Sequence, residues 1–243
     1  MIEIVAATRA SQADFRTSTP LGLSLSRLAR DQRLIPFITF SNTSPNTQGL
    51  PVVYNQRIQA SKPENDYLLF IHDDVRIDDF FVADHIIRGL SQYDIVGVAG
   101  NRRRVPNQPA WAFIDDQFTC DTENLTGSVA HGATPFGVVS RFGSVPAECE
   151  LLDGVFLAAR RSTLVGKGVS FDAQFDFHFY DMDFCRTARV NGLKLGTWHI
   201  SIAHTSGGAF GTPDWRAKLS LYRQKWKDEE NPKAPLMFTA QKL

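Results

Sequence analysis

The sequence predicts an α/β fold with a mostly parallel central sheet flanked by helices, and two observations support this prediction. In the first hundred residues, short apolar segments rich in β-branched residues alternate with segments whose apolar residues recur at helical spacing. This alternation is typical of βαβ units. In addition, the run at residues 68–71 contains only apolar and aromatic side chains, as expected for a strand that is buried on both faces.

The elements of the first hundred residues can be placed from this pattern. Leu21, Leu25 and Leu28 recur at helical spacing, which predicts a helix over residues 18–33. In chain order we expect a strand over residues 2–7, that helix, a strand over 35–40, a helix over 51–60, the strand over 68–71, a helix over 80–91 and a strand over 95–99.

The segment over residues 101–147 has a different character. It contains glycines, prolines and an arginine run at residues 102–104, with short apolar pieces at 110–114 and 136–142. We interpret it as an antiparallel insertion of hairpins and mobile loops that forms one wall of a cleft. The arginine run is either a solvated patch or a contact for phosphates or a polyanionic acceptor.

Regular structure is predicted to return after residue 150. Asp181 stands at the N-cap or in the first turn of a helix, and Gly192 closes that helix as a left-handed C-cap. The other expected elements are a buried strand over residues 155–159, a helical turn over 164–168, a strand over 193–202 that leads to His204, and a basic helix over 214–228.

Charge and cysteine content narrow the functional classes. Lys and Arg together number 26, as do Asp and Glu, so no net charge draws the chain to nucleic acid or to an anionic membrane. The N-terminus lacks the features of a secretory signal, and no apolar run is long enough to cross a bilayer. Cys120, Cys149 and Cys185 are widely spaced and odd in number, which favours unpaired thiols in a reducing compartment. We therefore expect a cytoplasmic protein.

Candidate metal ligands follow the strand at residues 68–71. His72, Asp73 and Asp74 end this apolar run, at the position where ligands bind in open α/β sheets. If the strand before His204 opens on the same edge, Asp74 and His204 can share a divalent ion, with His72 or Asp73 as a further ligand. Oxygen ligands with one imidazole suit Mn²⁺ or Mg²⁺, and such an ion would bridge the phosphates of a nucleotide-activated donor. The alternative is an acidic turn in water beside a packed histidine.

A candidate base lies at the start of the helix that begins near Asp181. Asp183 follows two residues later, so the two side chains point about 200° apart and only one of them can face a cleft. A carboxylate at a helix N-terminus is expected to stay ionised near neutral pH. Asp181 could therefore accept a proton from an attacking sugar hydroxyl. The alternative is that both are ordinary capping residues.

Three further polar residues are candidates for substrate contacts. Asp153 precedes a buried strand, where its carboxylate could accept hydrogen bonds from substrate hydroxyls. Thr8 and Arg9 follow the first strand and could hold a base or a phosphate. The alternatives are a turn aspartate and a surface ion pair of little energetic weight.

Several short motifs between residues 2 and 211 follow one another in a recognisable order. They are Tyr54-Asn55, His72-Asp73-Asp74-Val75, Leu152-Asp153-Gly154, Phe171-Asp172, and the run from Tyr180 to Arg186 with Gly192 after it. In this order they resemble the family 2 type of glycosyltransferase with the GT-A fold. The likeness is greatest to the subgroup named for its similarity to a streptomycin biosynthesis protein, in which His-x-Asp-Val replaces the usual Asp-x-Asp.

The resemblance implies an inverting transfer of a sugar from a nucleotide diphosphate sugar. The implied roles are metal ligation by Asp74, a place near the diphosphate and the metal for His204, nucleotide contacts by Asp73, Thr8 and Arg9, and proton abstraction by Asp181. Two positions depart from the family pattern. His72 replaces the first acidic residue, so the resemblance does not fix which residues ligate the metal. Tyr180 stands where an acidic residue often precedes the base, so Asp183 is kept as an alternative base.

We expect a single GT-A domain with a nucleotide-sugar-binding part over residues 1–100, an acceptor-binding and catalytic part over 101–211, and a C-terminal helix and tail over 212–243. The expected partners are a nucleotide diphosphate sugar and a glycan or lipid-linked acceptor, with a peripheral membrane contact through the basic C-terminal helix. Two other classes stay open. One is a non-catalytic sugar-nucleotide or glycan binding protein, and the other is a metal-dependent phosphoesterase that uses His72, Asp74, His85 and His204.

Overall fold

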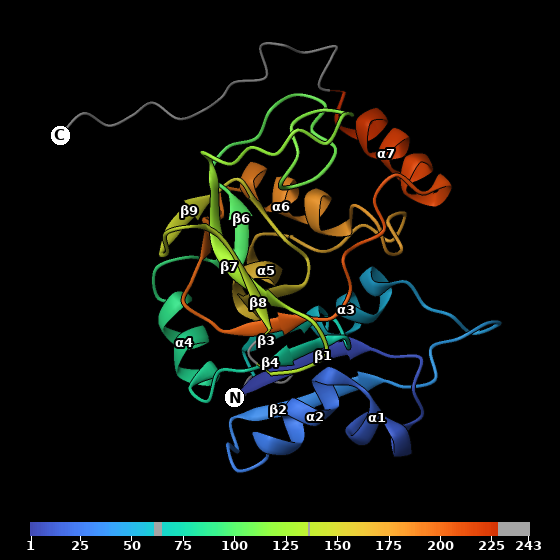
Figure 1. Cartoon of the computed structure of the whole chain (residues 1–243), viewed down its shortest axis with the longest axis vertical. Helices are drawn as coiled ribbons and strands as arrows, with labels where there is room; N and C mark the ends of the chain where they lie inside the picture. Colours follow the sequence, from blue (N-terminus) through green and yellow to red (C-terminus); the bar gives the residue numbers. More distant parts are fainter. Residues whose placement is uncertain (61–64, 136, 228–243) are drawn as a thin grey trace.

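The computed structural model describes residues 1–60, 65–135 and 137–227, and a mixed central sheet runs through the molecule (Figure 1). Its strands are, in spatial order, β2 (Leu34–Thr39), β1 (Ile2–Ala7), β3 (Tyr67–Ile71), β11 (Phe156–Arg160), β5 (Ile95–Gly97), β12 (Leu195–Thr197) and β9 (Ala147–Cys149). Only β11 and β9 run opposite to the other strands of this sheet. The predicted α/β class with a central sheet flanked by helices is confirmed.

A second sheet packs beside the first and is mainly antiparallel. It is formed, in spatial order, by β10 (Leu151–Leu152), β6 (Ala99–Asn101), β7 (Leu125–His131), β13 (Ile202–His204) and β4 (Val75–Ile77), with β8 (Val138–Gly143) paired to β7. The predicted insertion therefore contains the β7–β8 hairpin. Residues 110–114 form no strand and make only one bridge, Phe113 to Cys120, and position 136 of the other predicted piece lies outside the described residues.

Two segments predicted as single strands each contribute to both sheets. Residues 95–99 divide into β5 and β6, and residues 193–202 divide into β12 and β13. In both cases the first piece pairs in the central sheet and the second piece pairs in the second sheet. Periodicity could not reveal this division, because the pieces are almost entirely buried and show no alternation of buried and exposed residues.

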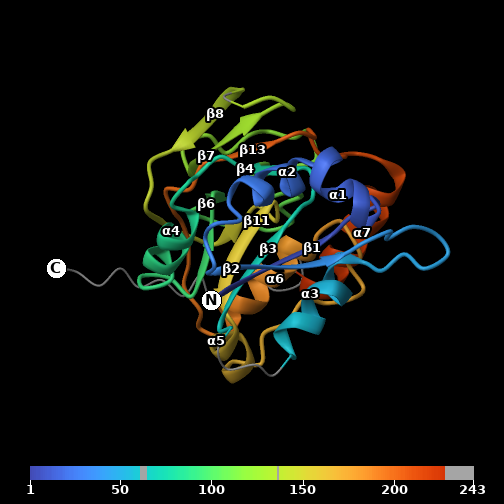
Figure 2. The same cartoon turned by 90° about the horizontal axis from the view of Figure 1, so that it is seen from below.

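The helices cover the central sheet from two sides. They are α1 (Gln12–Ser18), α2 (Pro20–Arg27), α3 (Leu50–Ile58), α4 (Val82–Gly89), α5 (Arg161–Gly166), α6 (Tyr180–Val190) and α7 (Pro213–Trp226). Figure 2 shows α3, α5 and α6 on one side of the sheet, with α1, α2 and the second sheet on the other. The predicted basic helix over residues 214–228 is α7, and residues 228–243 lie outside the described part of the chain.

The predicted helix over residues 18–33 corresponds to the shorter helix α2, which ends at Arg27 and is separated from α1 by Thr19. The backbone of Thr19 is extended, at φ −100° and ψ 143°, as expected for a residue that precedes proline. Its hydroxyl accepts a hydrogen bond from the amide of Gly22 and caps α2, which begins at Pro20. The helical periodicity at Leu21, Leu25 and Leu28 thus belongs to α2 and its C-cap, while α1 lies before the predicted start.

A buried carboxylate links β1 to two helices. Glu3 is fully buried, and its Oε2 atom lies 2.7 Å from Nη2 of Arg161 and 2.9 Å from Nη2 of Arg57. Its Oε1 atom accepts a 3.0 Å hydrogen bond from Asn65. Arg57 belongs to α3 and Arg161 to α5, so this cluster fixes both helices against the first strand.

Replacing Glu3 with alanine is expected to destabilise the fold by about 3–5 kcal/mol, because two guanidinium groups would lose their buried carboxylate. Urea unfolding followed by circular dichroism measures this change. The matched control is Arg33→Ala, which removes exposed pairs to Asp31 and Asp84 and should cost at most about 1 kcal/mol. Equal losses in the two variants would contradict the assignment of Glu3 as a structural anchor.

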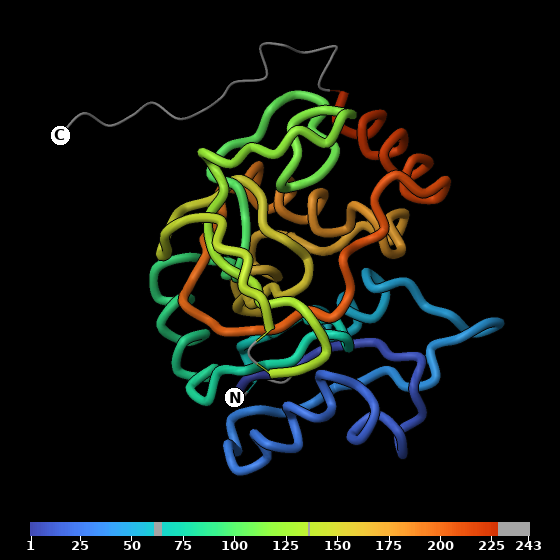
Figure 3. The backbone as a smooth tube through the Cα atoms, viewed as in Figure 1, coloured from blue at the N-terminus to red at the C-terminus, as the bar shows by residue number. Residues whose placement is uncertain are grey.

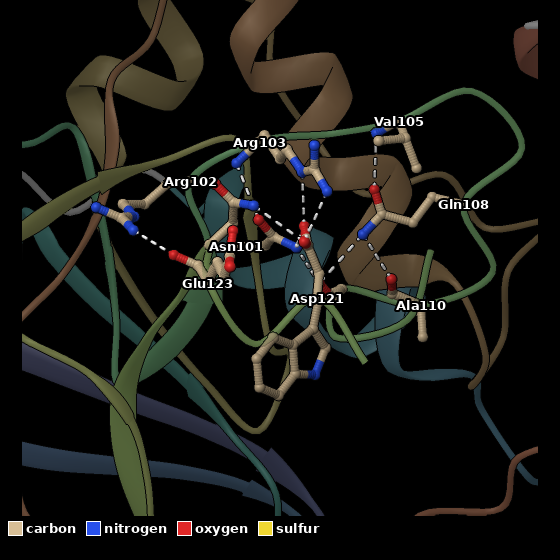
Figure 4. Close-up of polar contacts among 10 residues, drawn as sticks. Asn101, Arg102, Arg103, Val105, Gln108, Ala110, Asp121 and Glu123 are labelled. Atoms are coloured by element: carbon tan, nitrogen blue, oxygen red, sulfur yellow. Dashed lines mark hydrogen bonds and ion pairs between the residues drawn. The ribbon is translucent and has the colours of Figure 1, made fainter. Parts of the chain in front are cut away.

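The arginine run at residues 102–104 holds its own loop together. Figure 4 shows Arg103 and Asn101 both directed at Asp121, and Gln108 bonded to the loop that it lies in. Arg103 makes two 2.8 Å bonds to Asp121, which is 5% exposed, and Arg102 donates to the carbonyl of Glu123. Arg102 and Arg103 thus both have hydrogen-bond partners in this loop, but their side chains remain exposed, so a solvated patch and a phosphate contact both stay open as predictions.

The same loop lies beside α7, as the backbone trace shows (Figure 3). Arg223 of α7 pairs with Asp116 and donates to the carbonyl of Asn107. Lys218 and Lys225 pair with Asp176 and Asp172. The basic flank predicted to meet an anionic membrane surface is thus used largely to hold α7 against the rest of the protein. Among the described helices, none combines the length and apolar character of a membrane span.

Candidate functional site

The candidate site forms where β3 ends and β11 begins. The two strands are antiparallel, with Ile71 opposite Phe156. The residues that follow β3 therefore lie beside those that precede β11, and the amide of His72 donates to the carbonyl of Val155. This pairing brings the His72–Asp74 turn next to Asp153 and Gly154.

His204 reaches the same place through the second sheet. β4 begins directly after Asp74 and pairs antiparallel with β13, which sets His204 opposite Val75. The amide of Thr205 donates to the carbonyl of Asp74. The expectation that one sheet carries both Asp74 and His204 is wrong, since β3 and β13 belong to different sheets. The two residues meet because the chain passes from the central sheet to the second sheet at Asp74.

His72, Asp74 and His204 form a compact group of potential metal ligands. One ligand atom from each residue lies within 4.8 Å of the others. Oδ1 of Asp74 is 3.3 Å from Nε2 of His204 and 3.9 Å from Nδ1 of His72. Among the described residues, Asp73 does not belong to this group, so the third candidate ligand is His72.

The protonation states of His72 and Asp74 suit metal binding. Burial lowers the pKa of His72 to about 4, so the ring is neutral at physiological pH. Burial opposes ionisation of Asp74, but the polar contact with His204 and the charge of that ring bring its pKa down to about 2. Burial likewise opposes protonation of His204, yet its contact with Asp74 raises its pKa above the ordinary value. A cation would thus compete with a proton at His204.

One atom of the group indicates that these residues fit a divalent cation. Oδ1 of Asp74 is buried and has no well-aligned hydrogen-bond donor in the described part of the chain, although both imidazole rings approach it. A buried carboxylate oxygen without a donor is costly. A cation coordinated by this oxygen and by the two imidazoles would remove that cost.

Asp181 lies in the first turn of α6 and is held by backbone amides. Its Oδ2 atom accepts a 3.0 Å hydrogen bond from Gly154, and its Oδ1 atom accepts a 2.8 Å bond from Met182. Asp183 points away, toward α7, where it accepts hydrogen bonds from Lys225 and Trp226. The two carboxylates thus point in different directions, as predicted, and the contacts of Asp183 argue against it as the base.

The environment of Asp181 differs from the expected one. Burial, together with the nearby charge of Asp153, raises the pKa of Asp181 to about 6, although the amide hydrogen bonds oppose this rise. Asp181 is thus still mostly ionised near neutral pH, as expected, although burial outweighs the stabilising effect of the amides on its charged form. Asp153 is itself partly buried and accepts a hydrogen bond from the amide of Val155. Its removal from solvent raises its pKa. The two carboxylates form a coupled pair beside the metal-ligand group.

Gly154 permits this arrangement because it has no side chain. A Cβ atom at this position would lie 2.3 Å from the hydroxyl oxygen of Tyr180 and 2.8 Å from Cβ of Asp181. The tyrosine hydroxyl donates a 2.9 Å hydrogen bond to the carbonyl of Gly154. The Asp153-Gly154 turn and the start of α6 thus fit together only with glycine between them.

The residues predicted to contact a nucleotide also lie together. Thr8 follows β1 and is buried, and its hydroxyl hydrogen-bonds Asp73. Arg9 is close enough for its charge to oppose the rise in the pKa of Asp73 that burial causes. Asn55 does not belong to this cluster, because its side chain bonds both backbone groups of Phe171.

Two aromatic residues at the site were missed at the level of sequence. Tyr180 hydrogen-bonds His72 through its hydroxyl at 2.7 Å. The ring of Phe177 stacks on that of His72, with centroids 6.0 Å apart and planes 25° apart, and its side chain is 52% exposed. The only available signal was the aromatic run before Asp181, which is equally consistent with core packing. His85, by contrast, bonds Asp79 at 2.6 Å and is absent from the ligand group of the described residues.

Comparisons with known proteins give matches only at the level of structure. No family model and no curated protein matches the chain. The catalytic domain of Drosophila β1,4-galactosyltransferase 7, in complex with xylobiose, is 10% identical, with a TM-score of 0.49 over 90% of this chain and 79% of that chain. S. aureus TarS 1-349 is 13% identical, with a TM-score of 0.47 over 90% of this chain and 62% of that one. A 4-diphosphocytidyl-2C-methyl-D-erythritol synthase from Anaerococcus prevotii is 10% identical, with a TM-score of 0.41.

Proposed function

We propose that this protein is a metal-dependent glycosyltransferase of the family 2 type with a GT-A fold, which transfers a sugar from a nucleotide diphosphate sugar to a hydroxyl acceptor. One observation carries the proposal. The ligand group His72, Asp74 and His204 lies beside a partly buried carboxylate, Asp181, whose pKa of about 6 suits a general base. A cation site and a base in one place are what transfer to a hydroxyl requires.

The proposed roles follow from position. Thr8, Arg9 and Asp73 hold the nucleotide at the ends of β1 and β3. A bound cation would neutralise charge on the diphosphate. Two imidazoles among the three ligands favour Mn²⁺ over Mg²⁺, because Mg²⁺ prefers an all-oxygen shell.

In the proposed chemistry, Asp181 accepts the proton of the acceptor hydroxyl while the hydroxyl oxygen forms a bond to the anomeric carbon. The bond from that carbon to the diphosphate oxygen breaks, and the nucleoside diphosphate departs with the electron pair. A single displacement of this kind inverts the anomeric configuration. Asp153 accepts hydrogen bonds from substrate hydroxyls and keeps the pKa of Asp181 raised.

We further propose a division of roles between the two parts of the chain. Residues 1–100 bind the nucleotide sugar, and residues 101–211 supply the base and the acceptor wall. The loop braced by Asn101, Arg103 and Asp121 belongs to that wall. The exposed ring of Phe177 offers an apolar surface to a glycan or to the sugar of a lipid-linked acceptor.

The test combines calorimetry with product analysis. Uridine, guanosine and thymidine diphosphates are titrated with and without Mn²⁺, and the matching sugar nucleotides are then assayed for hydrolysis and for transfer to a panel of acceptors. The proposal predicts Mn²⁺-dependent nucleotide binding and slow donor hydrolysis without an acceptor. Tight binding with neither hydrolysis nor transfer would instead support a non-catalytic sugar-nucleotide binding protein.

The pH dependence of transfer is expected to reflect the ionisation of Asp181. The base is active only when it is deprotonated, so kcat at saturating substrates should fall about tenfold for each pH unit below the pKa of about 6 and level off above it. In Asp153→Asn the neighbouring negative charge is removed, so the pKa of Asp181 falls and the acid limb should move to lower pH. Identical acid limbs in the two proteins would contradict the coupling of these carboxylates.

A further inference from the structure

A chain of hydrogen bonds joins the metal-ligand group to the base. Nε2 of His72 lies 2.7 Å from the hydroxyl oxygen of Tyr180, that hydroxyl donates to the carbonyl of Gly154 at 2.9 Å, and the amide of Gly154 donates to Asp181. Tyr180 is buried and directly precedes Asp181 in α6. One side chain therefore touches both halves of the proposed site.

The directions of these hydrogen bonds determine where His72 carries its proton. A carbonyl oxygen can only accept, so the single proton of the Tyr180 hydroxyl points to Gly154. The tyrosine oxygen must then accept from His72, which places the proton of the neutral ring on Nε2. The lone pair consequently lies on Nδ1, the nitrogen that is 3.9 Å from Oδ1 of Asp74.

We propose that Tyr180 is a positioning residue that selects the tautomer and the orientation of His72, so that Nδ1 is available as a metal ligand. This inference rests on the proposed metal site. His72 stands where the family motif has an acidic residue. This replacement creates a need for a hydrogen-bond partner, because an imidazole ligand requires one on its second ring nitrogen and a carboxylate ligand does not. Tyr180 supplies that partner and connects it to the loop that holds the base.

A second buried tyrosine provides a matched control. Tyr54 is fully buried and its ring contacts that of Tyr180, with centroids 5.9 Å apart. Its hydroxyl makes no well-aligned hydrogen bond among the described residues, and the polar side chain that it approaches is that of Tyr180, not that of His72. Tyr54→Phe and Tyr180→Phe therefore remove the same atom from neighbouring buried rings, and only the second removes a bond to His72.

The test measures Mn²⁺ affinity by calorimetry on the wild type, Tyr180→Phe and Tyr54→Phe. Loss of an outer partner of a metal-bound histidine typically lowers metal affinity about 10–100-fold, and we expect a loss of this size for Tyr180→Phe and no change for Tyr54→Phe. Nitrogen-15 NMR of the histidine rings without metal provides an independent reading. It should show the proton of His72 on Nε2 in the wild type and a mixture of tautomers in Tyr180→Phe.

The outcomes separate this inference from the proposed function. Absence of Mn²⁺ binding by the wild type would overturn the metal site and with it the role of Tyr180. Wild-type binding with the same affinity in Tyr180→Phe would overturn the role of Tyr180 alone, as would a proton on Nδ1 of His72 in the wild type. Equal losses in Tyr180→Phe and Tyr54→Phe would assign the effect to core packing and also overturn it.

Discussion

The variant Asp181→Asn is expected to lower kcat by about a thousandfold, within the range that general base catalysis contributes. Asparagine has nearly the same shape as aspartate, and its single carbonyl oxygen can still accept one of the two amide hydrogen bonds, from Gly154 or from Met182. It cannot take up the proton of an acceptor hydroxyl. Initial rates at saturating donor and acceptor measure the loss. Calorimetry with a nucleoside diphosphate and Mn²⁺ should give the wild-type affinity, because Asp181 contacts neither the candidate ligands nor the nucleotide cluster.

The control for this variant is Asp183→Asn. Asp183 is 1% exposed and bonds Lys225 and Trp226 of α7, so its loss should reduce stability while the folded fraction keeps a kcat within a few-fold of wild type. Unfolding curves and rates corrected for the folded fraction distinguish the two effects. A normal kcat in Asp181→Asn together with a large loss in Asp183→Asn would reverse the assignment of the base.

The second large effect is expected for Asp74→Asn. Asp74 is the one carboxylate in the ligand group and the residue that both imidazoles face. The amide removes the charge that attracts a cation and is a poorer ligand than a carboxylate. We expect Mn²⁺ affinity to fall at least about 100-fold and transfer to be lost at metal concentrations that saturate the wild type. Calorimetry checks the fall in Mn²⁺ affinity, and activity measured over a wide range of Mn²⁺ concentration checks the loss of transfer.

Asp79→Asn is the matched control, because Asp79 is another buried aspartate that bonds a histidine. Its partner is His85, at 2.6 Å, and the pair lies outside the ligand group. This variant should bind Mn²⁺ as the wild type does. A comparable loss of affinity in both variants would show that the metal does not bind at Asp74.

Local sequence patterns were sufficient to predict those structural features that depend on residues close together in the chain. The apolar run that ends at His72 is β3, and Asp181 lies in the first turn of α6, which is followed by Gly192 in the left-handed conformation at φ 78°. Cys120, Cys149 and Cys185 are free thiols, as expected. Residues a few positions apart determine strand burial, helix capping and the need for glycine at the left-handed position after α6. A single sequence is therefore enough to predict these features.

The residues that end the buried strand and begin the helix, and therefore the side chains available for chemistry, could be identified from one sequence. The folded chain was needed to show that His204 reaches Asp74 through a second sheet, that β11 runs antiparallel and brings Gly154 to the site, and that Tyr180 bonds His72. These contacts join residues up to 130 positions apart, the separation of Asp74 and His204. Strand order and direction arise from pairing between distant backbone segments, and no local pattern of side chains specifies that pairing.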